Sequence, residues 1–311
     1  MASRACATGT VARRKAVSPM TELPLVVGVD GSEASLTAVD WAVDEAARHG
    51  LPLRLVYACL WERYEDGTAP AGGREPFSER ALAEQIVASA AARARRRSPD
   101  VTTATGIVPQ EAVTALLSEG DKAFAVVTGA RGRGVLKDLL PGSVGPAVAA
   151  RARCPVVVVR GDGAGLAGTH RRVLLGAGEP DTAGDAVRFA FREAEARGCV
   201  LDVVRAWHRP VYGGAGRPPP GADTAHRHER EAAELLDALL GDASAGRPRV
   251  RVDRTTPEGH ARKVLVDRSA AADLVVVGVR PRHGRAGHPL GRVAHALLHH
   301  ALCPVALVPR R

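Results

Sequence analysis

The chain has 311 residues, a hydrophobic content of 45% and a formal net charge of +9. This length predicts two globular domains of ordinary size, and because no stretch of about 18 uncharged apolar residues occurs, no membrane partner is expected. The positive charge is not gathered into a base-reading motif, and no aromatic residues interleave with the arginines to stack on bases. We therefore expect no specific nucleic-acid partner.

The first 22 residues differ in composition from the rest. Residues 1–19 are rich in Arg and Ala and contain no acid, which faintly resembles a transit peptide, but they lack the apolar core of a secretory signal. Met20, the only other methionine, lies just before the first apolar run, so a start there would give a chain that begins with the fold. We treat 1–22 as a disordered or extra tail, which would not be translated if the chain starts at Met20.

The five cysteines form neither a Cys-x-x-Cys pair nor a zinc-binding spacing. Cys154 and Cys303 each precede a proline and a Val-rich run. Small buried thiols in a reducing cytosol fit this pattern better than a redox role. We therefore expect a cytoplasmic protein.

Apolar runs alternate with helical patterns along residues 23–160. The run at 25–29 predicts a buried strand, and Ser32 then caps a helix with Leu36, Val39 and Val43 on one face and Gly50 at its end. Strands that are apolar on both faces and alternate with helices are typical of a parallel sheet covered on both sides. Further strands are predicted at 53–59, 101–108, 124–128 and 155–160, and further helices at 79–97, 110–119 and 143–151.

The same pattern occurs twice. Gly28 and Gly176 lie 148 positions apart, and both Gly129 and Gly278 and the two Cys-Pro pairs lie 149 apart, a nearly constant offset that indicates duplication. The predicted fold class is therefore α/β, with two tandem doubly wound domains, each a five-stranded parallel sheet flanked by helices. The domains are expected at 23–160 and 171–311, joined by a flexible Gly- and Ala-rich linker at 161–170. Strands of the second domain are predicted at 173–177, 200–206, 250–254, 274–279 and 305–308.

The segment GARGRGVLKDLLPGS, residues 129–143, carries a glycine pattern typical of phosphate binding. Gly129 and Gly132 are followed, after nine further residues, by Gly142 and Ser143. Glycines let backbone N–H groups approach an anion closely. A helix that begins at Ser143 would turn the positive end of its dipole toward the same anion.

Over about residues 23–309 the chain resembles the universal stress protein family in its tandem two-domain form. The Gly-x-x-Gly, nine-residue, Gly-Ser pattern is that family's nucleotide-binding motif, and VVGVDGS at 26–32 is similar to its first strand and the acidic residue that follows. The resemblance implies an ATP-binding stress-response or regulatory module, with Mg²⁺ accompanying a nucleotide held mainly in the first domain. It further implies that Asp30 contacts the adenosine and that the base lies at Ala58. The residues expected to bind the nucleotide are Gly28, Asp30, Ala58, Thr128, Gly129, Arg131, Gly132, Arg133, Gly142, Ser143 and Val144, the last through its backbone N–H.

Some of these residues also fit a purely structural role. Asp30 and Gly31 form a common turn pair, and Ala58 is an ordinary core residue. Arg131 and Arg133 fit solvated surface arginines as well as phosphate ligands. Ser143 fits an N-cap, with or without a contact to phosphate.

The second copy departs from the motif. Gly178 stands in place of Asp30, Pro281 replaces Gly132 and removes an N–H donor, and Arg292 replaces Ser143, where a cation opposes the helix dipole. We therefore expect this domain to be a scaffold with an impaired or altered site. His295 and His299 lie four apart on a predicted helix, but no third ligand is placed, so solvent exposure is expected and no metal ligand is predicted.

The alternative function is a slow ATP-hydrolysing enzyme of the adenine-nucleotide hydrolase-like superfamily. The sequence has no Walker pattern, no Ser-Gly-Gly after the first strand and no second carboxylate placed to hold Mg²⁺ against Asp30. We therefore predict no catalytic residue and at most weak ATPase activity. A flavin-binding redox module is disfavoured because nothing aromatic is available to cover the flavin ring.

The resemblance implies that the fifth strand lies at the edge of each sheet, so the fifth strands, at 156–159 and 305–308, are expected to pair the two domains within one chain. An apolar sheet edge left open invites pairing with another strand, and duplication supplies that strand in the same chain. The resemblance also leaves a homodimer open, with no surface indicated by the residues.

Overall fold

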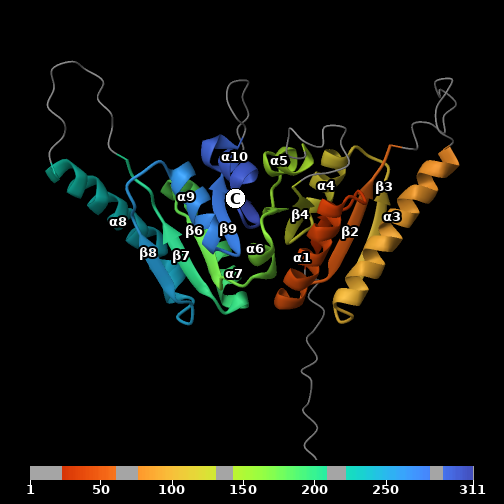
Figure 1. Cartoon of the computed structure of the whole chain (residues 1–311), viewed down its shortest axis with the longest axis horizontal. Helices are drawn as coiled ribbons and strands as arrows, with labels where there is room; N and C mark the ends of the chain where they lie inside the picture. Colours follow the sequence, from red (N-terminus) through yellow and green to blue (C-terminus); the bar gives the residue numbers. More distant parts are fainter. Residues whose placement is uncertain (1–22, 61–75, 131–142, 209–221, 281–289, 311) are drawn as a thin grey trace, which may run out of the picture.

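The computed structural model describes residues 23–60, 76–130, 143–208, 222–280 and 290–310 (Figure 1). Within these ranges ten strands form one continuous sheet in the order β3-β2-β1-β4-β5-β10-β9-β6-β7-β8. Neighbouring strands are parallel except β5 and β10. The predicted class of two tandem doubly wound α/β units, each with five parallel strands, is confirmed. The strands are β1 (Leu25–Gly28), β2 (Leu53–Ala58), β3 (Thr103–Val108), β4 (Ala125–Gly129), β5 (Val156–Val159), β6 (Arg172–Gly176), β7 (Val200–Val204), β8 (Val252–Thr255), β9 (Leu274–Val279) and β10 (Val305–Pro309).

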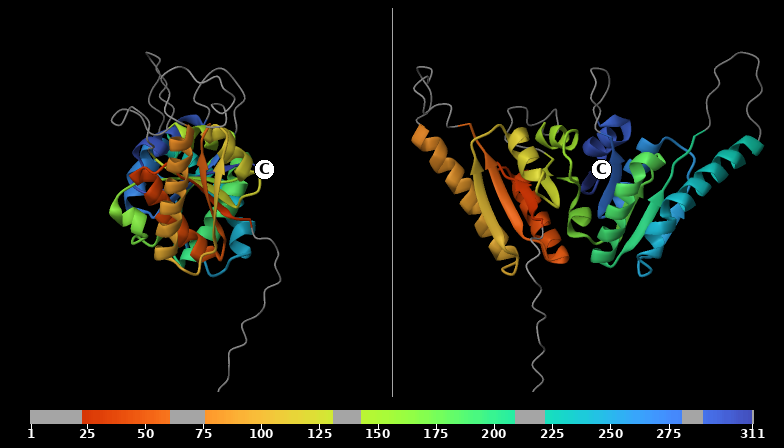
Figure 2. Two further views of the ribbon diagram at one scale, coloured as in Figure 1. Left: turned by 90° about the vertical axis from the view of Figure 1, so that its right-hand side faces the viewer. Right: turned by 180° about the vertical axis from the view of Figure 1, so that it is seen from behind.

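Helices cover both faces of the sheet. One face packs against α1 (Glu33–His49), α3 (Pro76–Arg97), α7 (Pro180–Arg197) and α8 (Ala222–Ala245), and the other against α4 (Ala112–Gly120), α5 (Val144–Ala149), α9 (Ala261–Arg268) and α10 (Gly291–His300). Buried strand residues alternate accordingly, with Leu25 and Val27 in the first core and Val26 in the second. The view from behind in Figure 2 shows the two halves side by side, with α3 and α8 at opposite ends. No helix in the described ranges is both long enough and apolar enough to cross a bilayer.

Helix α1 begins and ends where the sequence predicts. Ser32 is the N-cap, and its side chain accepts a hydrogen bond from Ser35 N at 3.2 Å. Gly50 follows the last turn in the left-handed conformation, with φ of 67°, and its N–H donates to Ala46 O and Ala47 O. These two caps fix the helix that packs over β1 and β4.

Two arginines at the end of α3, Arg93 and Arg97, have partners on α1. Arg93 donates two hydrogen bonds to the carboxylate of Asp40, at 2.7 and 2.6 Å. Arg97 does the same to Asp44, with both contacts at 2.7 Å. These two arginines therefore bind α3 to α1 through paired hydrogen bonds. Their position at the end of α3 also suits the negative end of the helix dipole.

The two halves join through β5 and β10, as predicted. The strands pair antiparallel, with Val305 opposite Val158 and Leu307 opposite Val156. Arg160, just after β5, extends into the second half, where its guanidinium donates to Leu297 O at 3.2 Å, to Leu298 O and to His299 O at 2.7 Å at the end of α10. The pairing of β5 with β10 makes the sheet continuous from β3 to β8, and Arg160 adds side-chain contacts between the halves.

The segment at 161–170, expected to be a flexible linker, contains the short helix α6 (Gly163–Ala167). Asp162 caps its start by accepting from Gly165 N at 2.9 Å, and Gly168 ends it in the left-handed conformation. A Cβ on Gly161 would lie 2.3 Å from Leu302 O, and one on Gly165 would lie 2.7 Å from the same atom. The glycines therefore permit close packing against the second half, which composition alone could not distinguish from flexibility.

Candidate functional site

The order of the strands reverses between β1 and β4. From β1 the chain moves outward to β2 and β3, whereas β4 lies on the other side of β1. Val27 pairs with Val127 in parallel register, so the residues that follow β1 and β4 leave the sheet at the same edge. This is the upper edge in Figure 1. The carboxyl edge at such a reversal is where doubly wound sheets bind ligands.

Asp30, which follows β1, is held at this edge by its own turn. One carboxylate oxygen, Oδ1, accepts hydrogen bonds from Ser32 N at 2.9 Å and Ser32 Oγ at 2.6 Å. The Asp30 N–H donates to Ser35 Oγ at 3.4 Å. Gly31 supplies the turn with a φ of 76°. The structural interpretation of Asp30 is therefore borne out locally, and the same bonds fix the carboxyl group at the sheet edge.

Packing around Gly129 leaves no space for a side chain, and the space around Gly28 is tight. A Cβ on Gly129 would lie 2.5 Å from Ala34 O and 2.6 Å from Ala34 C, in the first turn of α1. A Cβ on Gly28 would lie 3.0 Å from a methyl carbon of Leu116 on α4. The end of β4 thus approaches the helix backbone too closely for any side chain, whether or not a ligand is bound.

Thr128 lies beneath α5. Its side chain is buried, and its hydroxyl has no hydrogen-bond partner among the described residues. A Cβ on Gly145, in α5, would lie 2.8 Å from Thr128 Oγ1. The hydroxyl therefore points at the helix that follows the motif.

Ser143 and Val144 stand at the start of α5. Ser143 occupies the N-cap position and is exposed, but its side chain makes no capping hydrogen bond. Val144 is the first helical residue, and the helix ends at Ala149, two residues earlier than predicted. Ala58 ends β2 opposite Val108 and is half-buried, so it lies at the same sheet edge as Asp30. The remaining predicted residues, Arg131, Gly132, Arg133 and Gly142, lie outside the described residues.

The equivalent edge in the second half is occupied differently. β6 and β7 pair Gly176 with Val204, as β1 and β2 pair Gly28 with Val56, so Arg205 corresponds to Tyr57. The Arg205 guanidinium donates to Ala177 O at 3.3 Å, to Gly178 O at 2.6 Å and to Glu179 Oε1 at 3.0 Å. A cation therefore binds the backbone of the turn that follows β6, beside the glycine that stands in place of Asp30.

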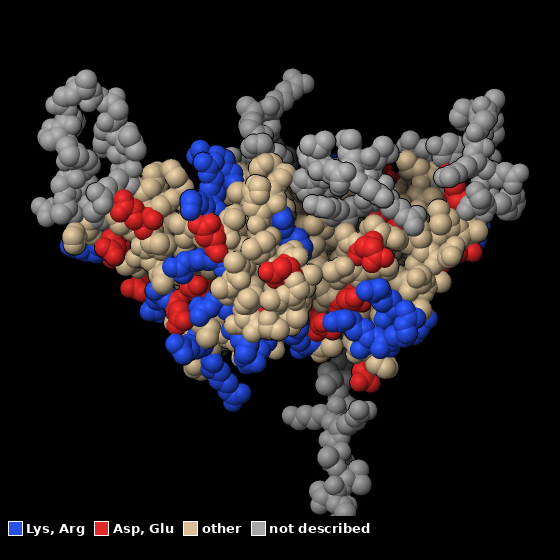
Figure 3. All heavy atoms as spheres, in the orientation of Figure 1, with Lys and Arg blue, Asp and Glu red and all other residues tan. Residues whose placement is uncertain are grey.

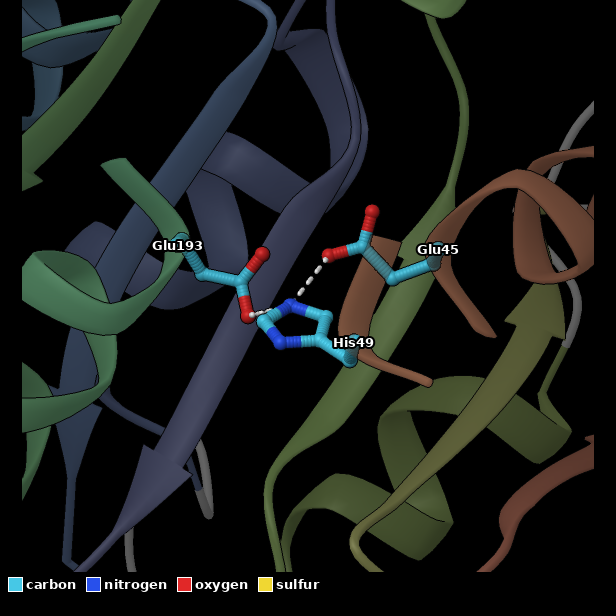
Figure 4. Close-up of side chains that lie close together, drawn as sticks. All are labelled: Glu45, His49 and Glu193. Atoms are coloured by element: carbon cyan, nitrogen blue, oxygen red, sulfur yellow. Dashed lines mark ion pairs between the residues drawn. The ribbon is translucent and has the colours of Figure 1, made fainter. Parts of the chain in front are cut away.

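Sequence reasoning missed a buried ionic cluster where α1 meets α7 (Figure 4). His49 Nε2 lies 3.3 Å from Glu45 Oε1 and 3.2 Å from Glu193 Oε1. Arg197 Nη2 lies 2.6 Å from Glu45 Oε2, and Arg197 Nε lies 3.5 Å from Glu193 Oε2. The side chains of all four residues are at most 8% exposed. We call Glu45, His49, Glu193 and Arg197 the interface cluster.

A duplicated sequence pattern underlies the interface cluster. Glu45 and His49 lie four apart on α1, and Glu193 and Arg197 lie four apart on α7. Each pair occupies the same place in its helix, because both helices end one residue later in a left-handed glycine, Gly50 and Gly198. A Glu followed four residues later by a cation, repeated at this offset, is the signal that could have predicted the cluster.

The environment of the interface cluster shifts its titrations. Burial and the neighbouring Glu45 carboxylate raise the pKa of Glu193 to about 7. Burial alone would lower the pKa of His49, but hydrogen bonding and charge from Glu193 and Glu45 raise it to about 9. Burial opposes ionisation of Glu45, yet the charge of Arg197 and the close approach of Glu193 and His49 to the Glu45 carboxylate hold the pKa of Glu45 well below its usual value.

Donor atoms of Glu45, His49 and Glu193 lie within 4.8 Å of one another, close enough to surround a metal ion. Arg197 contacts both carboxylates, and Arg48 Nη1 also lies 2.7 Å from Glu45 Oε2. With His49 protonated and Glu193 ionised, as between about pH 7 and pH 9, the four residues of the cluster carry two positive and two negative charges. We therefore interpret the cluster as a self-compensated ion-pair network that joins the halves.

Comparison with known proteins identifies relatives along nearly the whole chain. The sequence model of the universal stress protein family matches residues 24–160 and again 169–309. A universal stress protein of Mycobacterium tuberculosis is 32% identical over 291 residues, which cover 92% of this chain and 97% of the relative. One from Mycolicibacterium smegmatis is 31% identical over 302 residues, covering 95% and 100%.

Among solved structures, a universal stress protein from Archaeoglobus fulgidus shares the fold over 94% of this chain and all of its own, with a TM-score of 0.65 at 16% identity. Another structure from Archaeoglobus fulgidus, a universal stress protein in complex with dAMP, matches 45% of this chain with a TM-score of 0.35 at 23% identity.

Proposed function

The chain belongs to the universal stress protein family, and on that premise we propose that it binds an adenine nucleotide, ATP with Mg²⁺, in its first half. The nucleotide lies at the carboxyl edge of β1 and β4, and its presence changes the conformation or partner choice of a stress-response module. The family motif at Gly129, Gly132, Gly142 and Ser143 supports binding of the phosphates, and membership of the family supports the choice of adenine.

The difference between the two equivalent edges carries this proposal. In the first half, Asp30 is held by Ser32 at the edge where the order of strands reverses. In the second half, Gly178 stands there instead, and its carbonyl accepts from the guanidinium of Arg205. The first edge therefore offers an acidic group suited to ribose hydroxyls, and the second offers a cation committed to the backbone.

The ends of the site suit the parts of the ligand. Ala58 is small and half-buried at the end of β2, which leaves room for a planar base. Ser143 is exposed, and its side chain makes no capping hydrogen bond, so the hydroxyl is available to a phosphate oxygen. Mg²⁺ would arrive with the nucleotide, since this ion is commonly held by substrate phosphates and one or two oxygen ligands of the protein.

Binding and regulation describe the module better than turnover. Asp30 Oδ1 is engaged by two donors from Ser32, which gives that oxygen a structural role rather than that of a general base.

We place the module in the cytoplasm because Cys59, Cys154, Cys199 and Cys303 are free thiols, two of them buried, as suits a reducing compartment.

The direct test is isothermal titration of the full-length chain with Mg-ATP, with Mg-GTP as the matched control. A stoichiometry near one, with ATP preferred, is expected. Mass spectrometry of ligand retained through native purification identifies the physiological nucleotide. Two equivalent sites, or equal affinity for ATP and GTP, would refute the assignment to the first half or to adenine.

A further inference from the structure

A basic hollow lies on the second half, between helices α9 and α10. Its volume is about 590 Å³. Six of its nine lining residues are cationic or imidazole side chains: His260, Arg262, Lys263, Arg292, His295 and His300. In Figure 3, Lys and Arg side chains gather over this region, whereas positive and negative side chains are mixed below it.

The positive charge of the hollow is poorly compensated. Its one acidic lining residue, Asp267, is already paired with Lys263, whose Nζ lies 2.9 Å away. Arg262 and Arg292 are exposed, and neither has an ion pair or hydrogen bond to another described residue. Two guanidinium groups beside one hollow repel each other, and an anion between them would relieve that repulsion.

The basic character is specific to the second half. Ala112 and Ala261 begin equivalent helices and Val156 and Val305 equivalent strands, which fixes an offset of 149. At this offset His260 replaces the acid Glu111, Arg292 replaces Ser143, and His295 replaces Pro146. Duplication alone would have placed an acid, a hydroxyl and a proline at these three positions, so the basic lining is a departure from the first half.

The helix start shows what the replacement changed. In the first half, the Glu111 carboxylate caps α4 by accepting from Thr114 N at 3.2 Å. In the second half, His260 takes that position without a capping hydrogen bond, and its ring instead lies 5.1 Å from that of His208. Glu111 would repel a phosphate, whereas His260 at the equivalent position can donate an N–H to one.

We propose that this hollow binds a small phosphate-bearing anion, held chiefly by Arg262 and Arg292. Guanidinium groups match phosphate oxygens in geometry as well as in charge. The hollow is bounded by two helices, and the surface below it mixes both signs of charge, which favours a compact anion over a long nucleic-acid backbone. This site is separate from the proposed nucleotide site and does not depend on it.

Isothermal titration with inorganic tripolyphosphate at low ionic strength tests this proposal. The full-length chain carrying Gly142→Ala and Ser143→Ala, which impair the motif in the first half without adding a cation there, is the starting protein. Adding Arg262→Gln and Arg292→Gln should weaken tripolyphosphate binding by about tenfold or more, because the charge-assisted hydrogen bonds are lost. A second titration with ATP distinguishes a nucleotide from free polyphosphate as the preferred source of phosphate.

The matched control is the pair Arg95→Gln and Arg96→Gln in the same starting protein. These arginines are exposed on α3 and have no ion pair to a described residue, so the control removes equal charge elsewhere. Equal weakening by both pairs would reduce the effect to net charge and overturn the site. Absence of tripolyphosphate binding in the starting protein would also overturn it, even if duplex DNA bound there. Failure of the ATP site alone would leave tripolyphosphate binding intact.

Discussion

His49 Nε2 lies 3.2 Å from Glu193 Oε1, and this contact joins α1 of the first half to α7 of the second. Arg197 makes the converse contact, from α7 to Glu45 on α1, at 2.6 Å. Because Glu45 matches Glu193 and His49 matches Arg197 in the duplicated sequence, each helix contributes one acid and one cation. The interface between the halves is thus pseudo-twofold symmetric in its charges as well as in its paired strands.

Stability should fall as the pH rises into the alkaline range. A raised folded-state pKa gives stability that is complete below the unfolded value and is lost as pH climbs through the folded value. For Glu193 that loss extends to about pH 7, and for His49 to about pH 9. The pKa of Glu45 is lowered, so the stability that Glu45 contributes is lost only when the pH falls into the acid range. Thermal unfolding of the wild type should therefore show a midpoint that declines from about pH 4.5, where the contribution of Glu193 begins to be lost, to about pH 9, where that of His49 is lost.

Replacing the histidine of the interface cluster should remove most of this dependence. His49→Gln takes away the cation between two buried carboxylates and should cost about 3 kcal/mol of unfolding free energy at neutral pH. Denaturant titration at several pH values measures both effects. His226→Gln, on an exposed position of α8, is the control and should change neither. If the unfolding free energy of His49→Gln depended on pH as steeply as that of the wild type, the assignment of this pH dependence to protonation of His49 would be wrong.

Gly129→Ala should destabilise the fold with or without nucleotide. The added Cβ would lie 2.5 Å from the backbone oxygen of Ala34, which cannot move without shifting α1, so a loss of about 2 kcal/mol or more is expected. Gly163→Ala is the control, because its Cβ would meet nothing within 4 Å. Chemical denaturation compares the two. A neutral Gly129→Ala would contradict the close packing of this glycine against α1.

Gly142→Ala combined with Ser143→Arg should abolish ATP binding while the protein stays folded. The change adds a Cβ where phosphate is expected and brings the motif closer to the second copy, where Arg292 replaces the serine. Titration calorimetry measures the affinity, and circular dichroism confirms the fold. Wild-type affinity in a folded variant would move the nucleotide away from this motif.

The separated first half, residues 21–160, should self-associate. Removing β10 exposes the edge of β5, whose four valines are buried in the full chain. Analytical ultracentrifugation measures the association. The full-length chain is the reference, because its β5 edge is already paired. A monomeric half at high concentration would show that the β5 edge does not drive pairing.

The sequence by itself determined the α/β class, the duplication, the caps of α1 and the pairing of β5 with β10. The first three follow from local chemistry and repetition: apolar runs flanked by helical periodicity, a constant offset between the halves, and Ser32 and Gly50 at helix ends. The pairing followed from the family resemblance, which implies that the apolar fifth strand is an edge that needs a partner. It also predicted that Asp30 and Gly129 would follow neighbouring strands, because a doubly wound sheet fixes that order.

Only the tertiary structure decided what each of these residues touches. Gly129 approaches Ala34, Gly161 approaches Leu302, and Glu193 meets His49 across 144 positions of chain. Such contacts depend on distances between elements, which no local pattern encodes. The interface cluster shows the reason most clearly, since a Glu four residues before a cation resembles an ordinary surface helix pair until packing buries it.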